Sequence, residues 1–113
     1  MATLNAVAVS SAAGITDLAA TAVAAAGGGD TAPCGPGHLL AVINGGATPQ
    51  TVTVATPGKS AGFALADATL TVPAGKTGLL ALGNAFRGVN DRAAITYSGV
   101  TSMTVAVIKL KGA

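Results

Sequence analysis

The chain has 113 residues, of which 9% are charged, and a formal net charge of +2. This length fits one domain, and a soluble domain usually carries about 25% charged residues, so we expect a single domain with few surface charges. Lys and Arg are scattered along the sequence and only 3% of residues are aromatic. A nucleic-acid-binding face concentrates cations and adds stacking rings, so we expect no nucleic-acid partner.

The sequence shows no expected export or membrane segment. The single cysteine, Cys34, cannot form an intramolecular disulfide, which argues against a secreted disulfide scaffold. Residues 1–23 contain no Lys or Arg, and Asp17 interrupts their apolar run, so we expect no signal peptide. A charged residue or a glycine interrupts each apolar run before it reaches 18 residues, so we expect no membrane span. These patterns favour a cytoplasmic site of synthesis and folding.

The first 29 residues are rich in alanine and glycine. Alanine over Ala12–Ala26 favours helix, but glycine, threonine and β-branched residues within it weaken that tendency, and we predict extended chain. Gly27–Gly29 predicts a flexible loop. We therefore expect residues 1–29 to form an extended N-terminal arm with a glycine hinge, and residues 30–113 to form the folded domain.

The remaining sequence predicts an all-β fold, a compact β-sandwich or barrel-like domain. Glycine is abundant, charge is sparse, and apolar residues alternate with threonine as they do in half-buried strands. The expected strands lie within His38–Ile43, Gln50–Val54, Ala68–Val72, Thr77–Leu82, 95–98 and Thr101–Leu110. The turn residues of Pro73–Lys76 predict a hairpin between the third and fourth of these strands.

Period-two alternation also predicts which side chains face the core. The expected core residues are Ile43, Val52, Val54, Leu70, Val72, Leu80, Ile95, Met103, Val105 and Val107. In the last strand Ile108 and Leu110 fall on the opposite face from Val107. This pattern indicates either a bulge near Val107 or a strand end covered on both sides.

Two segments supply candidate interface residues. The first, His38–Ile43, is apolar on both faces, so it is either a central strand or a strand with one face against a partner; Leu40 and Val42 share one of these faces. The second is the loop Gly83–Arg92, in which Phe86, Arg87 and Arg92 gather aromatic and cationic character typical of interfaces. The alternative, with Phe86 in the core and the arginines solvated, is equally open.

No residue pattern predicts catalysis or a bound cofactor. Cys34 and His38 are four positions apart, but no third group to orient them is evident, and we expect them to do no chemistry. Gly58, Lys59 and Ser60 match the end of a phosphate-binding loop, although Thr53 stands where its first glycine should be. The four aspartates lie far apart, and three of them, Asp30, Asp67 and Asp91, fit turn positions in expected loops. We expect no enzyme activity, no metal and no cofactor.

Several segments resemble a family of small tailed-bacteriophage head proteins, the capsid decoration or cement proteins. The resemblance covers about residues 27–110 and rests on the segments 38–47, 51–58, 65–67, 72–75 and 100–107. It implies a non-enzymatic virion protein that binds the outer surface of the head, with the major capsid protein as partner and assembly in the host cytoplasm. It also implies a homo-oligomer, a trimer by the habit of the family.

Two other functions remain open at this point. One is a different phage structural subunit, in head-tail joining or in the tail tube. The other is a ligand-binding or sugar-binding β-sandwich module, which usually stacks sugars on exposed Trp or Tyr; Tyr97 is the single tyrosine, and tryptophan is absent.

Overall fold

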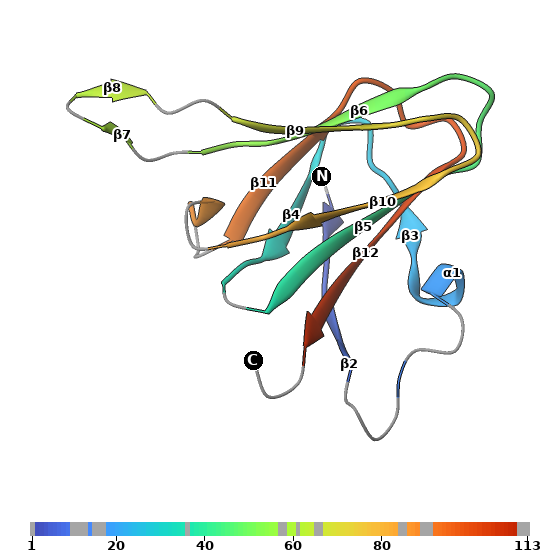
Figure 1. Ribbon diagram of the computed structural model, residues 1–113, viewed down its shortest axis with the longest axis horizontal. Helices are drawn as coiled ribbons and strands as arrows, with labels where there is room; N and C mark the ends of the chain where they lie inside the picture. The colour runs from blue at the N-terminus through green and yellow to red at the C-terminus, as the bar shows by residue number, and fades with distance from the viewer. Residues whose placement is uncertain are drawn as a thin grey trace.

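The computed structural model describes residues 2–9, 14, 18–35, 37–56, 59–60, 62–64, 67–83, 86–88 and 92–110. These residues form two sheets that pack face to face as a β-sandwich (Figure 1), which confirms the all-β prediction. The first sheet has the order β1 (Ala2–Thr3), β4 (Asp30–Pro33), β11 (Arg92–Tyr97), β6 (Gln50–Val54) and β9 (Ala68–Val72). In it β1 runs parallel to β4, and the other neighbours are antiparallel.

The second sheet has the order β10 (Thr77–Ala81), β5 (His38–Asn44), β12 (Met103–Leu110) and β2 (Ala6–Val9). A two-residue strand, β3 (Val23–Ala24), also pairs with β12. Two short strands, β7 (Lys59–Ser60) and β8 (Phe63–Ala64), form a separate hairpin that projects beyond β6 and β9 (Figure 1). One helical turn, α1 (Leu18–Thr21), precedes β3, and no helix in the described residues has the length and apolar character needed to cross a membrane.

The main core lies between the sheets. Its side chains are mostly small, because valine and alanine supply much of it. Its most deeply buried side chains, each under 2% exposed, include Leu40, Leu82, Ile95, Met103, Val42, Val52, Val54, Val72, Val105 and Val107. Of the ten predicted core residues, seven are in this set, and Leu70 and Leu80 pack against it half-buried. The prediction is wrong for Ile43, because Leu40 and Val42 take the inward face of β5 and Ile43 points to the other side.

β12 is covered on both faces. It pairs with β5 without a break from Met103 to Lys109, so there is no bulge near Val107. Val105 and Val107 face the main core, while Ala106 and Ile108 form a second small cluster with Ala41 on the outer face of the same sheet. The second of the two alternatives for this strand is therefore correct at Ile108 but not at Leu110, which is 42% exposed.

β9 and β10 are joined by the predicted turn but do not form a hairpin. The amide of Lys76 donates to the carbonyl of Pro73 at 3.1 Å, and the chain then passes from one sheet to the other. Val72 of β9 and Leu80 of β10 therefore reach the same core from opposite layers. Gly78 makes this crossing possible, since a Cβ there would stand 3.1 Å from side-chain carbons of Leu70 and Val72.

The extended N-terminal arm expected for residues 1–29 is not confirmed, because the described part of this segment pairs with both sheets of the sandwich. β1 joins the first sheet and β2 the second, and Leu4 between them is 3% exposed in the main core. Gly29 is buried against Ile95, so it is not a free hinge. The extended conformation predicted for Ala12–Ala26 is correct at β3 and wrong at α1; residues 12–13 and 15–17 lie outside the described residues.

Candidate functional site: the basic end of the sandwich

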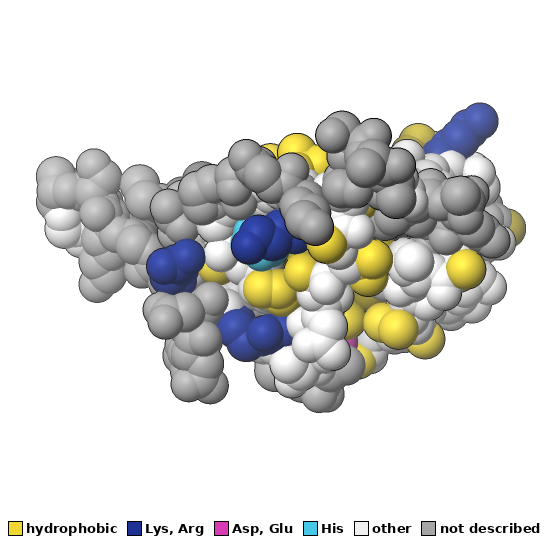
Figure 2. All heavy atoms as spheres, turned by 90° about the horizontal axis from the view of Figure 1, so that it is seen from below, with side chains coloured by type: hydrophobic (Ala, Val, Ile, Leu, Met, Phe, Trp, Pro, Cys, Tyr) yellow, Lys and Arg dark blue, Asp and Glu magenta, His cyan; other side chains and the backbone are white. Residues whose placement is uncertain are grey.

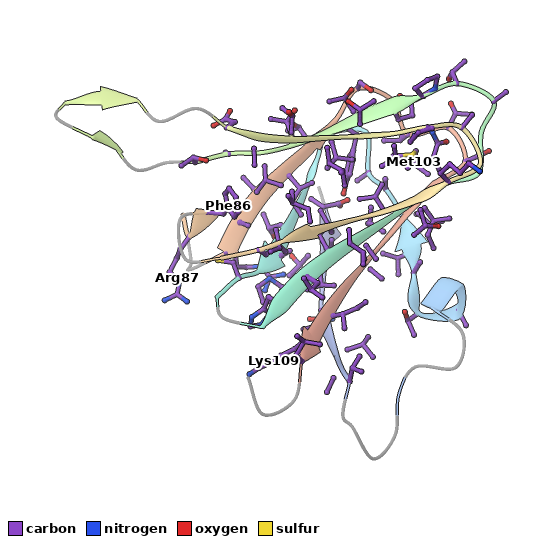
Figure 3. All side chains as sticks on the ribbon, viewed as in Figure 1. Phe86, Arg87, Met103 and Lys109 are labelled. Atoms are coloured by element: carbon purple, nitrogen blue, oxygen red, sulfur yellow. The ribbon has the colours of Figure 1, made fainter. Side chains whose placement is uncertain are left out.

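Three cationic side chains and the histidine gather at one end of the sandwich, which we call the basic end: Arg87, Arg92, Lys109 and His38. Figure 2 shows Lys and Arg side chains around a hydrophobic patch, with the histidine against one of them. Figure 3 shows Arg87 and Lys109 at this end of the molecule and Met103 at the other. The sequence did not reveal the gathering, because it depends on strand pairing between residues far apart in the chain.

The segment that leads from β4 into β5 holds this end together. Lys109 stands opposite His38 in the pairing of β12 with β5, and Arg92 stands opposite Pro33 in the pairing of β11 with β4. Arg87 donates from Nη2 to the carbonyl of Cys34 at 3.2 Å. The three cations therefore come from two strands and one loop, and all of them adjoin the same short connection.

The three cations differ in how firmly they are held. Arg92 is half-buried: its Nε donates to Thr31 Oγ1 at 3.1 Å, and its Nη2 donates to the carbonyls of Thr31, at 3.1 Å, and Leu4. Arg87 and Lys109 are exposed. No ion pair joins any of them to a carboxylate among the residues that the structure describes, so the positive charge of this end is not neutralised there.

Phe86 and Arg87 take different roles in one loop. Phe86 is half-buried and packs against the main core, whereas Arg87 points away from the sheets (Figure 3). This supports the interpretation of Phe86 as a core residue and leaves Arg87 available to a partner. Leu40 and Val42, the other predicted interface residues, are fully buried between the sheets and offer no surface to a partner.

Cys34 and His38 both lie at the basic end. Cys34 is 6% exposed, and burial keeps its thiol from bulk solvent. His38 is half-buried, and its Nδ1 is buried with no hydrogen-bond partner in the described structure. An unsatisfied buried nitrogen costs free energy, but one such atom does not make a catalytic group.

The carboxylates occupy structural positions. Asp30 is fully buried and accepts a hydrogen bond from the Tyr97 hydroxyl at 2.6 Å, while the exposed Asp67 accepts one from the amide of Thr56 at 2.9 Å. Asp17 and Asp91 lie outside the described residues, as do Pro57 and Gly58 of the apparent phosphate-loop match. Within the described ranges, no group of three or more His, Cys, Asp or Glu side chains is placed to hold a metal ion.

A cavity of about 370 Å³ opens at the side of the sandwich between the β1–β2 crossover and β3. Its lining is mostly apolar and includes Leu4, Val7, Val23, Val105 and Val107. None of its described lining residues is cationic, although Leu4 in the lining accepts a hydrogen bond from Arg92 of the basic end.

Comparisons of this chain with protein-family models, characterised proteins and solved structures find no match.

Proposed function

We propose that this chain is a non-enzymatic structural protein of a tailed-bacteriophage virion, a capsid decoration protein that binds the outside of the head as a homo-oligomer. The sequence resemblance suggests the role, and the cations of the basic end, which form no ion pair with a carboxylate of the described residues, support it. Among the residues whose burial the structure describes, Lys76 and Asp67 are the exposed charged side chains outside that end. A surface so poor in charge, with one cationic end, suits docking on an acidic protein surface.

Two of the three aromatic side chains of the sequence have contacts inside the sandwich. Tyr97 is half-buried with its hydroxyl committed to Asp30, and Phe86 packs on the core, so neither ring is free to stack on a sugar or a base. A sandwich that presents cationic side chains at one end is consistent with a protein that works by binding alone.

The proposed mechanism is stabilisation by mass action. A protein that binds only the assembled lattice lowers its free energy by RT ln(1 + [L]/Kd), about 2.7 kcal/mol per site when the free concentration is one hundred times Kd. Because a shell repeats the site many times, moderate affinity at each position adds up to a large resistance to disassembly. The trimer implied by the resemblance stays part of this proposal.

The test is to mix the purified protein with undecorated shells of the major capsid protein from the same genome and to measure bound copies per shell by sedimentation. Charge reversal at the basic end, Arg87→Glu with Lys109→Glu, should reduce occupancy at least tenfold, and added salt should weaken wild-type binding because it screens exposed charges. Both side chains are exposed, so the fold should survive.

The matched control is Lys76→Glu. Lys76 is also exposed, but its carbonyl accepts from Asn44 at the far end of β5, a strand of seven residues that separates it from His38. This variant should bind shells as the wild type does. Absence of binding by the wild type would refute the decoration role, and retention on a DNA oligonucleotide in place of shells would point to a nucleic-acid partner.

A further inference from the structure

One edge of the second sheet is open along β10. In the described structure this strand pairs only with β5. Two hydrogen bonds at the ends of that ladder, from Asn44 N to Lys76 O and from Leu82 N to His38 O, each 2.9 Å long, show that the even-numbered residues direct their backbone groups toward β5. The amides and carbonyls of Thr77, Leu79 and Ala81 therefore point away from the sheet.

This edge lacks the features that normally prevent strands from adding to one another. Natural edge strands carry a lysine, a proline or a bulge, whereas β10 has none of these over Thr77–Ala81. Leu79 is 56% exposed, the largest exposed fraction among the large hydrophobic side chains described. The edge strand of the other sheet, β9, instead presents threonines, Thr69 and Thr71, as its exposed side chains.

The outward side chains near Leu79 continue its apolar character. Leu79 stands opposite Ala41, which belongs to the small cluster on the outer face of the second sheet. The flanking pairs on this face, Thr77 with Ile43 and Ala81 with Leu39, carry no charge. A strand added beside β10 would thus extend an uncharged face.

We propose that β10 pairs with β10 of a second copy of this chain, antiparallel and centred on Leu79, so that two sheets become one across a two-fold axis. In this register Leu79 faces its own counterpart and Thr77 faces Ala81 of the partner copy. All three outward-pointing residues form hydrogen-bonded pairs, with about six inter-chain hydrogen bonds since each such pair exchanges two.

A second copy fits this edge for three reasons. The strand is uncharged, so a copy of it meets no repulsion; its outward groups are symmetric about Leu79; and an isologous contact closes without leading to a fibre. Five paired residues bury less than the roughly 800 Å² per partner of a stable interface, so the contact is weak in solution and depends on concentration. It goes beyond the proposed function and needs no capsid for its test.

The experiment measures the mass of the full chain by sedimentation equilibrium between about 10 µM and 1 mM, a range suited to an interface of this size. The average mass of the wild type should rise at least twofold across the range, because each copy in the dilute assembly has one β10 edge to pair. Leu79→Lys should prevent this rise. Leu79→Pro should do the same, because it removes an outward amide and leaves the groups of Gly78 and Leu80 that face β5.

The matched control is Thr69→Lys. Thr69 is exposed on β9, the edge strand of the other sheet, and takes no part in the proposed pairing of β10. The mass of this variant should rise as that of the wild type does. Amide hydrogen exchange gives an independent measurement: protection of Leu79 should rise with concentration in the wild type. A constant wild-type mass and unchanging exchange at Leu79 would overturn the proposal, as would equal effects of the Leu79 and Thr69 variants.

Discussion

The hydroxyl of Tyr97 donates a 2.6 Å hydrogen bond to the fully buried carboxylate of Asp30, which also accepts from the amide of Ala26 at 3.3 Å. The two residues lie on neighbouring strands of the first sheet, β11 and β4. Tyr97→Phe removes the hydroxyl donor and leaves a carboxylate oxygen less satisfied in the interior. We expect a loss of about 1–3 kcal/mol in the free energy of unfolding, measured by urea denaturation.

The same pair predicts a dependence on alkaline pH. Burial, the hydrogen bond to Asp30 and the charge of Asp30 all raise the pKa of Tyr97 well above its usual value near 10. Above that pH the unfolded chain loses the tyrosine proton and the folded chain keeps it, so stability falls as pH rises. Tyr97→Phe should lack this contribution, and its stability should fall less steeply than that of the wild type between about pH 10 and 11.5. Parallel slopes would contradict the assignment.

Gly29 is predicted to be intolerant of any side chain. Its φ is +94°, and a Cβ there would stand 2.7 Å from the carbonyl oxygen of Ile95. Gly29→Ala therefore combines backbone strain with a backbone clash, and we expect a loss of about 2 kcal/mol or more. Gly27→Ala is the control, since nothing lies within 4 Å of its Cβ position. Thermal unfolding of the two variants should differ clearly, and equal melting temperatures would contradict the prediction.

Asn44 uses its whole amide at the far end of β5. It is 1% exposed; its Nδ2 donates to the carbonyls of Thr48, at 2.9 Å, and Val72, at 3.0 Å, and its Oδ1 accepts from the amide of Gly46 at 3.0 Å. Asn44→Asp replaces both donors by a carboxylate facing two carbonyl oxygens. We expect a loss of about 2–4 kcal/mol at pH 7.

The pH dependence of Asn44→Asp separates the effect of the introduced negative charge from that of the altered side-chain shape. Protonation of the introduced carboxyl restores one donor, so Asn44→Asp should recover stability as pH falls from 7 to 4, relative to the wild type over the same range. Asn44→Ala offers no titrating group and should show no such recovery. Chemical denaturation at several pH values checks both variants, and an equal pH response of the two would count against the proposed donor pattern.

Alternation in the sequence predicted six long strands of this fold. β5, β6, β9, β10, β11 and β12 begin and end within three residues of the expected segments, because valine, isoleucine and threonine at period two have few other ways to bury one face. The turn at Pro73–Lys76 was also correct. What failed was the pairing across it, since two strands joined by a tight turn can lie in one sheet or in two, and the small size of Gly78 allows the crossing.

Other features depend on contacts between distant residues and leave no local pattern. Both faces of His38–Ile43 are apolar, so the sequence could not show that Leu40 and Val42 point inward and Ile43 outward. The N-terminal strands are rich in alanine, which favours helix. Pairing of these strands with β4 and β12 overrides that weak preference. The basic end forms only when Arg92 and Lys109 are brought beside the connection from Pro33 to His38.

Arg92 links the first sheet to the N-terminal crossover, the segment between β1 and β2 that contains Leu4. Its guanidinium donates to the carbonyl of Leu4 as well as to Thr31, and the amide of Leu4 donates to the carbonyl of Thr31 at 2.8 Å. Arg92→Lys keeps the charge but loses the planar array of donors that reaches several acceptors at once. We expect a loss of about 1–3 kcal/mol in stability and a larger effect on local opening, with the amide of Leu4 exchanging its hydrogen at least tenfold faster.

Arg87→Lys is the control for this variant. Arg87 is exposed, and its one described hydrogen bond, to the carbonyl of Cys34, needs a single donor, which lysine also has. That substitution should leave both the unfolding transition and the exchange of Leu4 close to wild type. The two variants carry the same charge at the same end of the sandwich, so a difference between them reports the geometry of the guanidinium contacts and not the electrostatic field. Faster exchange at Leu4 in both variants, or in neither, would mean that Arg92 does not hold the crossover.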